Sequence, residues 1–331
     1  MKKSTILQLG AGALVTAGGL YIFLKEVKLS QLWLEVCQTP ISIIIATALL
    51  SPLSLFFRSI RLKLFLKSSN KATVTELFPQ VVIGFMANNI FPARLGEAVR
   101  IFLLWKKSGF TLAESIGALV VERIIDTVFF LPFFFIPVFF SINLKSLHFY
   151  GYILVGVFAT ACFCGFLYGR FPSFVKKIGK SLNGFLPKKM RTGVGKIGSE
   201  VISNLDWLFS IKKTALVFVL SFTILFCYAI MMWLLGIDLD NFGALGGMFG
   251  VAFAAIGAAI PLAPGYVGTM HALLLSGLGM AGVAAERAGA IAVLYHAIGY
   301  VTVTSLGLYY FFSIKLSFRM FETIKKDLSG E

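Results

Sequence analysis

The sequence predicts an all-α, polytopic membrane protein. Hydrophobic residues make up 58% of its 331 residues, whereas charged residues make up only 14%. The apolar residues form continuous runs close to the ~20 residues that a helix needs to cross a bilayer, and they lack the alternation of a membrane β-barrel. Two further apolar stretches contain helix-breaking residues near their middle. Together these observations predict about six spanning helices and two broken helical hairpins within a single transmembrane domain, residues 1–331.

Six uninterrupted apolar runs are expected to cross the membrane as single helices. The first run follows Met1-Lys2-Lys3 and shows no clear small-residue cleavage site, so it is expected to be a span rather than a removable signal. The expected spans cover residues 6–24, 41–57, 112–140, 150–169, 214–235 and 288–313.

The charges of the loops orient these spans. Basic residues gather before the first span, after the second span, where Arg58 and Arg61 begin a basic loop, and after the last span. Such loops face the cytoplasm in multi-pass proteins, so both ends of the chain are expected there. The loop 236–242 carries only the acidic charges of Asp238 and Asp240 and is expected on the opposite side.

The segment 170–213 carries ten basic and two acidic residues and is also expected in the cytoplasm. Its apolar residues recur at three-to-four spacing between lysines, which predicts an interfacial amphipathic helix on the anionic lipids of the inner leaflet. A solvated linker is the alternative. The net charge of +15 is also typical of nucleic-acid-binding proteins. Here the basic residues lie in short loops beside apolar spans, which argues against nucleic acid as a partner.

Helix breakers divide the two remaining apolar stretches, residues 76–105 and 243–284, into pairs of short helices. The breaking residues are Asn88, Asn89, Pro92 and Gly96 in the first stretch and Pro261, Pro264, Gly265 and Gly268 in the second. By the loop charges, the first stretch enters and leaves from the cytoplasm and the second from outside. This predicts two re-entrant hairpins related as an inverted repeat, an arrangement typical of transporters. A pair of full spans in either stretch is the alternative.

Ionisable residues inside the apolar stretches indicate a functional site, because a charge in the bilayer is expensive. The charges concerned are Arg94, Glu97 and Arg100 in the first broken stretch and Glu122, Arg123 and Asp126 in the third span. The first trio falls on one helix face. In the second, Glu122 and Asp126 share a face and Arg123 lies three residues before Asp126. Two carboxylates on one face repel each other unless a cation lies with them. An arginine from the other helix is expected to supply that cation.

The same arginines are suited to a phosphate, because a guanidinium donates two parallel hydrogen bonds. The short helices after Pro92 and after Pro264 also direct the positive ends of their dipoles toward the breaks. We therefore expect a midplane anion site. Its expected binding residues are Arg94, Arg100, Arg123, Asn88, Asn89, Gly265 and His271, with Glu97, Glu122 and Asp126 as its charge network. The alternative is a charge network that only holds the broken helices together.

Other chemistry is poorly supported by the sequence. His271 is read as a headgroup donor, a proton carrier or a packing residue, and for His296 the packing role is favoured. The four cysteines show no metal-ligand spacing, and no glycine-rich phosphate loop with a Lys-Ser/Thr ending is present. We expect no metal, no cofactor and no ATP hydrolysis.

Three ordered motifs carry a family resemblance: Asn88–Glu97 with Arg100, Val121–Asp126, and Pro261–Thr269. With them the chain, over roughly residues 5–315, resembles the membrane region of lysylphosphatidylglycerol synthase, which also occurs as stand-alone flippase-like proteins. One departure is His271, because many family members have glutamate or glutamine there. The resemblance does not extend to the soluble aminoacyl-transferring domain of the synthase.

The resemblance implies a transporter, not an enzyme, that moves a phospholipid or lipid-linked intermediate between the leaflets of a bacterial or archaeal cytoplasmic membrane. Its expected partners are the lipid substrate, the anionic lipids of the inner leaflet and a lipid-modifying enzyme. Two other classes remain open. One is an intramembrane lipid-modifying enzyme, and the other is a membrane scaffold that recruits such an enzyme.

Overall fold

The structure, a computed structural model, describes residues 3–68, 71–91, 94–171, 200–240, 242–260 and 263–316, together with Ser173 and Gly198. Within these residues all regular secondary structure is helical, which confirms the predicted all-α class. Three predictions fall outside the described residues: the helix-breaking Pro92, the helix-breaking Pro261, and most of the interfacial helix, at 174–197.

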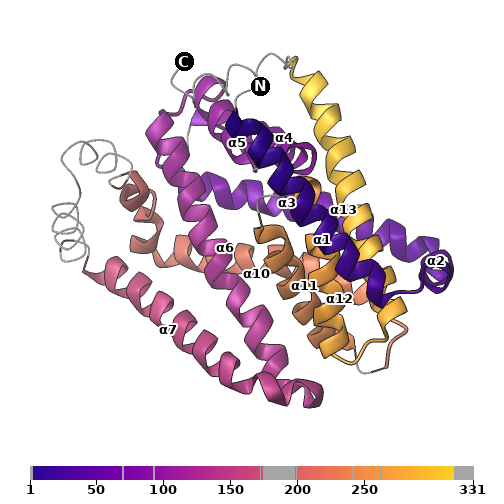
Figure 1. Ribbon diagram of the computed structural model, residues 1–331. Helices are drawn as coiled ribbons and strands as arrows, with labels where there is room; N and C mark the ends of the chain where they lie inside the picture. Colours follow the sequence, from indigo (N-terminus) through magenta and orange to yellow (C-terminus); the bar gives the residue numbers. More distant parts are fainter. Residues whose placement is uncertain are drawn as a thin grey trace.

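Long helices occur at all six places where a span was expected (Figure 1). They are α1 (Lys3–Glu26), α3 (Ile41–Phe65), α6 (Leu112–Phe140), α7 (His148–Arg170), α10 (Ile211–Leu235) and α13 (Ala285–Ser313). Four helical segments in the described part of the chain are clearly long and apolar enough to cross a membrane: α3, α10, α13 and Leu144–Arg170. The last of these joins α7 to the end of a 3-10 helix, η2 (Ile142–Leu147). Apolar length did not predict the short helix α2 (Leu29–Gln38) between α1 and α3.

Each broken stretch forms a pair of short helices that pack against each other. The first pair is α4 (Val74–Ile90) and α5 (Leu95–Lys106); the second is α11 (Gly243–Ala259) and α12 (Thr269–Met280), with the 3-10 turn η4 (Pro264–Tyr266) between them. Among the long helices, α13 packs along α4 and α10 along α3, whereas α7 lies at the edge of the molecule against α6 (Figure 1). The broken pairs are therefore held inside a frame of long helices, and their re-entrant path through the bilayer stays a prediction.

Three expected helix breakers lie within helices. Asn88 and Asn89 lie in the last turn of α4, and Gly96 is the second residue of α5. The Asn88 side-chain oxygen accepts a hydrogen bond of 2.8 Å from the Gly96 backbone N–H. The first N–H groups of a helix have no partner within the helix, so Asn88 caps α5 from the neighbouring helix.

Gly96 instead allows α5 to pack closely against α4. A methyl group added at Gly96 would overlap the carbonyl oxygen of Gly84, and one added at Gly84 would overlap the side chain of Arg100. Glycine is therefore required at both positions for the helices to approach. This approach directs Arg100 toward α6.

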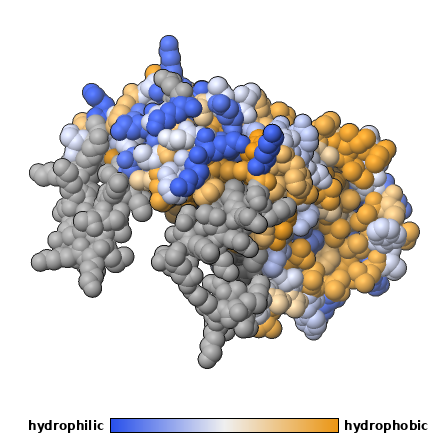
Figure 2. Space-filling view, turned by 90° about the horizontal axis from the view of Figure 1, so that it is seen from above, coloured by the Kyte–Doolittle hydropathy of each residue, from blue (hydrophilic) through white to orange (hydrophobic). Residues whose placement is uncertain are grey.

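The start of α1 and the end of α13 lie on the same side of the molecule (Figure 1). Two lysines lie on this side as well. The Lys71 Nζ donates to Gly109 O at 3.1 Å, and the Lys107 Nζ donates to Ile314 O, just after α13, at 3.3 Å. Figure 2 views the molecule from this side and shows hydrophilic side chains gathered over one part of the face, beside hydrophobic ones. Near the start of α13, Arg287 pairs with Asp238 instead.

We expect Gly96→Ala to destabilise the protein by about 1–3 kcal/mol, because overpacking forces the backbones of α4 and α5 apart. Thermal unfolding of the purified protein in detergent measures the effect. The matched control is Gly156→Ala in α7, where the added methyl group meets no atom within 4 Å. Equal unfolding temperatures for the two variants would contradict the close approach of α4 and α5.

Candidate functional site

A cluster of buried ion pairs lies where α3, α5 and α6 meet. Glu122 of α6 is fully buried and accepts hydrogen bonds of 2.9 and 2.7 Å from the two Nη atoms of Arg100, and one of 2.9 Å from Arg58 Nη1. Asp126, one helical turn further along α6, accepts a hydrogen bond of 2.6 Å from Arg58 Nη1 and pairs with Arg61. The cation expected between these carboxylates is therefore supplied from both α5 and α3.

Arg58 and Arg61 correct the loop expected after the second span. The second span does not end at residue 57, because α3 continues to Phe65 and holds both arginines inside the bundle, where they are 4% and 1% exposed. Arg61 also donates to the Ser221 hydroxyl of α10 at 3.0 Å. The sequence contained a signal for this role. The two arginines are three residues apart, a spacing that places them on one helix face. The carboxylates Glu122 and Asp126 needed cations as partners.

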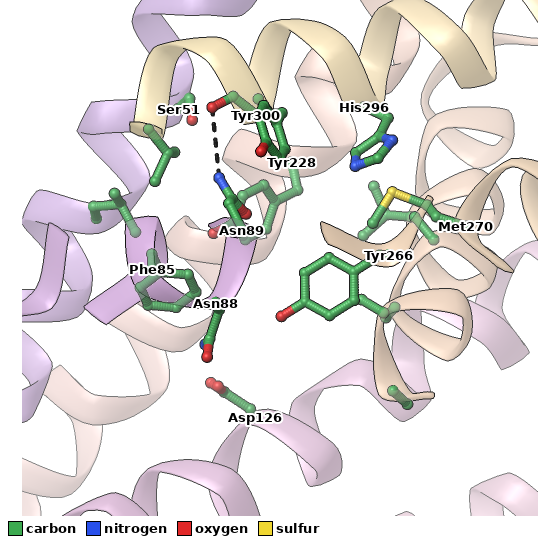
Figure 3. A pocket seen from close by; sticks show the side chains of 18 of the residues that line it. Ser51, Phe85, Asn88, Asn89, Asp126, Tyr228, Tyr266, Met270, His296 and Tyr300 are labelled. Atoms are coloured by element: carbon green, nitrogen blue, oxygen red, sulfur yellow. Dashed lines mark hydrogen bonds between the residues drawn. The ribbon is translucent and has the colours of Figure 1, made fainter. Parts of the chain in front are cut away.

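Next to this cluster is a cavity of about 340 Å³, bounded by α3, both broken hairpins, α6, α10 and α13. Its charged lining residues are Arg58, Arg94, Glu97, Arg123 and Asp126. The remaining lining is largely apolar or aromatic. Figure 3 shows Tyr266 with its hydroxyl directed toward Asn88 and Asp126. The cavity thus places charges within an otherwise apolar wall.

Arg94 connects the two broken hairpins across this cavity. It begins α5 with a left-handed backbone (φ 53°) and donates through Nη2 to Ala258 O of α11 at 2.6 Å. Carbonyls at the end of a helix carry the negative end of its dipole, so this contact is electrostatically favourable. The Arg94 Nε is buried without a hydrogen-bond partner, and no carboxylate pairs with Arg94 among the described residues.

Arg123 lies at the edge of the ion-pair cluster. Its Nε is 3.1 Å from Glu97 Oε1, and its Nη atoms are 3.6 Å from Asp126 and 3.8 Å from Glu122. Its side chain is 35% exposed, whereas the other arginines of the cluster are almost fully buried. Arg123 and Arg94 are consequently the two guanidinium groups that a guest in the cavity can reach most readily.

The breaks of the two hairpins touch each other. Gly265 has a left-handed backbone (φ 58°), and a methyl group added there would lie 2.9 Å from Asn89 O. The Asn89 side chain donates to the Thr304 hydroxyl of α13 at 3.1 Å. Asn89 and Gly265 therefore lie next to each other at the junction of the hairpins. The Asn89 side-chain amide already donates its hydrogen bond to Thr304.

Three expected binding residues do not line the cavity: Arg100, Gly265 and His271. Both Nη atoms of Arg100 are bound by Glu122, and the side chain does not line the cavity, so we assign it to the charge network. His271 also lies outside the lining, whereas His296, for which packing was favoured, belongs to it. The His296 Nε2 is 2.7 Å from Gly265 O. In the described part of the chain, no group of three or more His, Cys, Asp and Glu side chains is placed to hold a metal ion.

The sequence is similar to known membrane proteins. A family model described as the lysylphosphatidylglycerol synthase TM region matches residues 9–307. A UPF0104 membrane protein of Methanocaldococcus jannaschii is 25% identical over 236 residues, which cover 69% of this chain and 94% of that protein. No solved structure matches the chain.

We expect Glu122→Gln to lower the free energy of unfolding by about 3–5 kcal/mol, because the variant leaves buried guanidinium groups without their partner. Denaturant or thermal unfolding of the purified protein measures the loss, with the exposed Asp240→Asn as control. Combining Glu122→Gln with Arg100→Gln removes one buried charge of each sign. The double variant should be more stable than Glu122→Gln alone, and additive losses would argue against the pair.

Proposed function

Because this chain belongs to the family of lysylphosphatidylglycerol synthase TM regions, we propose that it is a lipid transporter. It moves a phospholipid or a lipid-linked intermediate between the leaflets and binds the phosphate of the headgroup in the cavity beside Arg94. The observation that carries this proposal is the Arg94 guanidinium, which faces the cavity without a carboxylate partner in the described chain.

The balance of buried charge supports an anionic guest. The cavity and its adjoining cluster contain five arginines and three carboxylates among the described residues, which leaves an excess of two positive charges. The arginines are at positions 58, 61, 94, 100 and 123, and the carboxylates at 97, 122 and 126. Uncompensated charge within an apolar bundle is costly, so a phosphate that enters the cavity is stabilised there.

The size and lining of the cavity match a headgroup rather than a whole lipid. A volume of about 340 Å³ lies at the lower end of the range for small-molecule sites. The acyl chains would remain in the bilayer while the headgroup crosses between the hairpins. Because Arg94 and the Asn89–Gly265 junction connect the hairpins, a relative movement of the hairpins would open the cavity toward one leaflet and then the other.

The orientation we propose places both termini in the cytoplasm of a bacterial or archaeal cell, with the protein in the cytoplasmic membrane. It is supported by Lys71 and Lys107, which lie on the side where α1 begins and α13 ends. Multi-pass proteins concentrate such charges in cytoplasmic loops.

We expect Arg94→Ala to abolish lipid translocation and Arg94→Lys to slow it by about tenfold or more, because lysine cannot reproduce a charge-assisted guanidinium fork. The measurement is leaflet translocation in proteoliposomes with labelled anionic, zwitterionic and polyprenyl-phosphate lipids. Arg170→Ala, at the end of α7, is the control. Wild-type translocation in Arg94→Ala would rule out this site. Chemical conversion of a lipid without translocation would favour the enzyme, and neither activity would favour the scaffold.

The orientation predicts which cysteines a membrane-impermeant thiol reagent can reach in intact cells. Asp240→Cys should be labelled from outside, whereas Lys71→Cys should be labelled only after the membrane is permeabilised. Both are made after serine replaces the four native cysteines, of which Cys227 is buried. The reverse pattern would invert the proposed topology.

A further inference from the structure

His271 of α12 and His296 of α13 form a continuous chain of hydrogen bonds that begins and ends on one backbone turn. The Gly268 backbone N–H donates to His271 Nδ1 at 3.3 Å. His271 Nε2 lies 3.4 Å from His296 Nδ1, and His296 Nε2 lies 2.7 Å from Gly265 O. The two rings are 4.8 Å apart, centre to centre, in an edge-to-face arrangement.

The backbone ends of this chain assign the proton positions. A carbonyl oxygen can only accept, so His296 Nε2 carries a hydrogen; a backbone N–H can only donate, so His271 Nδ1 carries a lone pair. The contact between the rings is then satisfied when His271 Nε2–H donates to His296 Nδ1. All three contacts are satisfied at once when both imidazoles are neutral.

An additional proton has no place in this chain. On His296 Nδ1 it would face the His271 Nε2–H, and on His271 Nδ1 it would face the Gly268 N–H. Either position turns a hydrogen bond into a contact between two donors and adds a positive charge. Protonation of the pair must therefore break one of the two longer contacts, at 3.3 or 3.4 Å.

The turn that the histidine pair holds has an unfavourable backbone. Gly265, Tyr266 and Gly268 all have positive φ angles, of 58°, 61° and 86°. A residue other than glycine in this region is held there by its surroundings, at a cost of order 1–3 kcal/mol. The Tyr266 ring projects from this turn into the cavity (Figure 3). Loss of a histidine contact would release the turn and shift Tyr266.

Among the described residues that line the cavity with His296, no carboxylate is free to neutralise the added proton. Phe23 of α1 packs edge-on against His271, and Tyr300 of α13 packs edge-on against His296. The charged groups that line the cavity with His296 are Arg58, Arg94, Glu97, Arg123 and Asp126, and the other titratable groups are the tyrosines at 228, 266, 295 and 300. Both carboxylates are paired with arginines. Apart from His271, α11 and α12 carry no titratable side chain.

We propose that His271 and His296 are a proton-binding site that couples proton uptake from the cavity to release of the Pro264–Gly268 turn. Imidazole is the side chain best suited to bind and release a proton at acidic pH, so one proton at this pair can serve as the coupling ion. That the released turn changes lipid passage rests on the proposed function. The proton-dependent release of the turn does not.

Hydrogen exchange of the full-length protein, followed in a peptide covering residues 263–272, tests the release. The comparison variant combines His271→Asn with His296→Gln. The Asn oxygen can accept from the Gly268 N–H, and the Gln amide can donate to Gly265 O, so the variant keeps both ends of the chain without an imidazole. Comparing the two proteins at the same pH cancels the intrinsic pH dependence of exchange.

We expect the two proteins to exchange equally near pH 8, and wild type to exchange up to about fivefold faster as the pH falls toward 4, the factor that corresponds to one lost hydrogen bond. His271→Asn alone should resemble the double variant, because the shorter asparagine side chain places no N–H where His271 Nε2 lay against His296 Nδ1. Equal exchange at both pH values, or acceleration in all three proteins, would overturn the proton site.

Translocation in proteoliposomes with an imposed pH gradient tests the coupling to lipid. The wild-type rate should change with the gradient, and the double variant should translocate at a rate that does not depend on it. If the turn responds to pH but translocation ignores the gradient, the coupling is refuted. If the turn responds and no lipid moves at all, the proton site stands and the proposed function fails.

Discussion

The balance between Glu122 and Asp126 and the arginines around them is the constraint on which the rest of the structure depends. Neither carboxylate is stable in an apolar bundle without its partners, and neither are the arginines. Because the partners come from α3 and α5, satisfying the charges fixes where a long helix and a broken hairpin meet α6. The same fit requires α5 to lie close to α4, which explains the glycines at 84 and 96.

The fold class and the places of the long helices were predictable because they depend on apolar length, which is local in the sequence. The end of α3 was not, because Arg58 and Arg61 look like loop bases until the carboxylates of α6 are placed beside them. Charge in a membrane protein is therefore ambiguous from sequence. The same arginine orients a loop or neutralises a buried acid, and only tertiary contacts decide which.

At the candidate site, residue types were easier to predict than residue roles. The trio on α5 was recognised, but its two arginines have different tasks: Arg100 completes the ion cluster, and Arg94 faces the cavity. Asn88 looked like a helix breaker and is a cap for the neighbouring helix. The histidine pair could not be foreseen, because the two residues are 25 positions apart and become partners only through the packing of α12 on α13.

The contact between Arg94 and the Ala258 carbonyl has a consequence for turnover. The Ala258 carbonyl near the end of α11 accepts a hydrogen bond that an anion could accept, so the protein itself supplies a weak ligand for Arg94. Under the proposed function, an incoming phosphate would displace this carbonyl, and the carbonyl would be available to displace the phosphate afterwards. Such internal competition lowers affinity, but it speeds release, and a carrier that releases its cargo slowly completes few cycles.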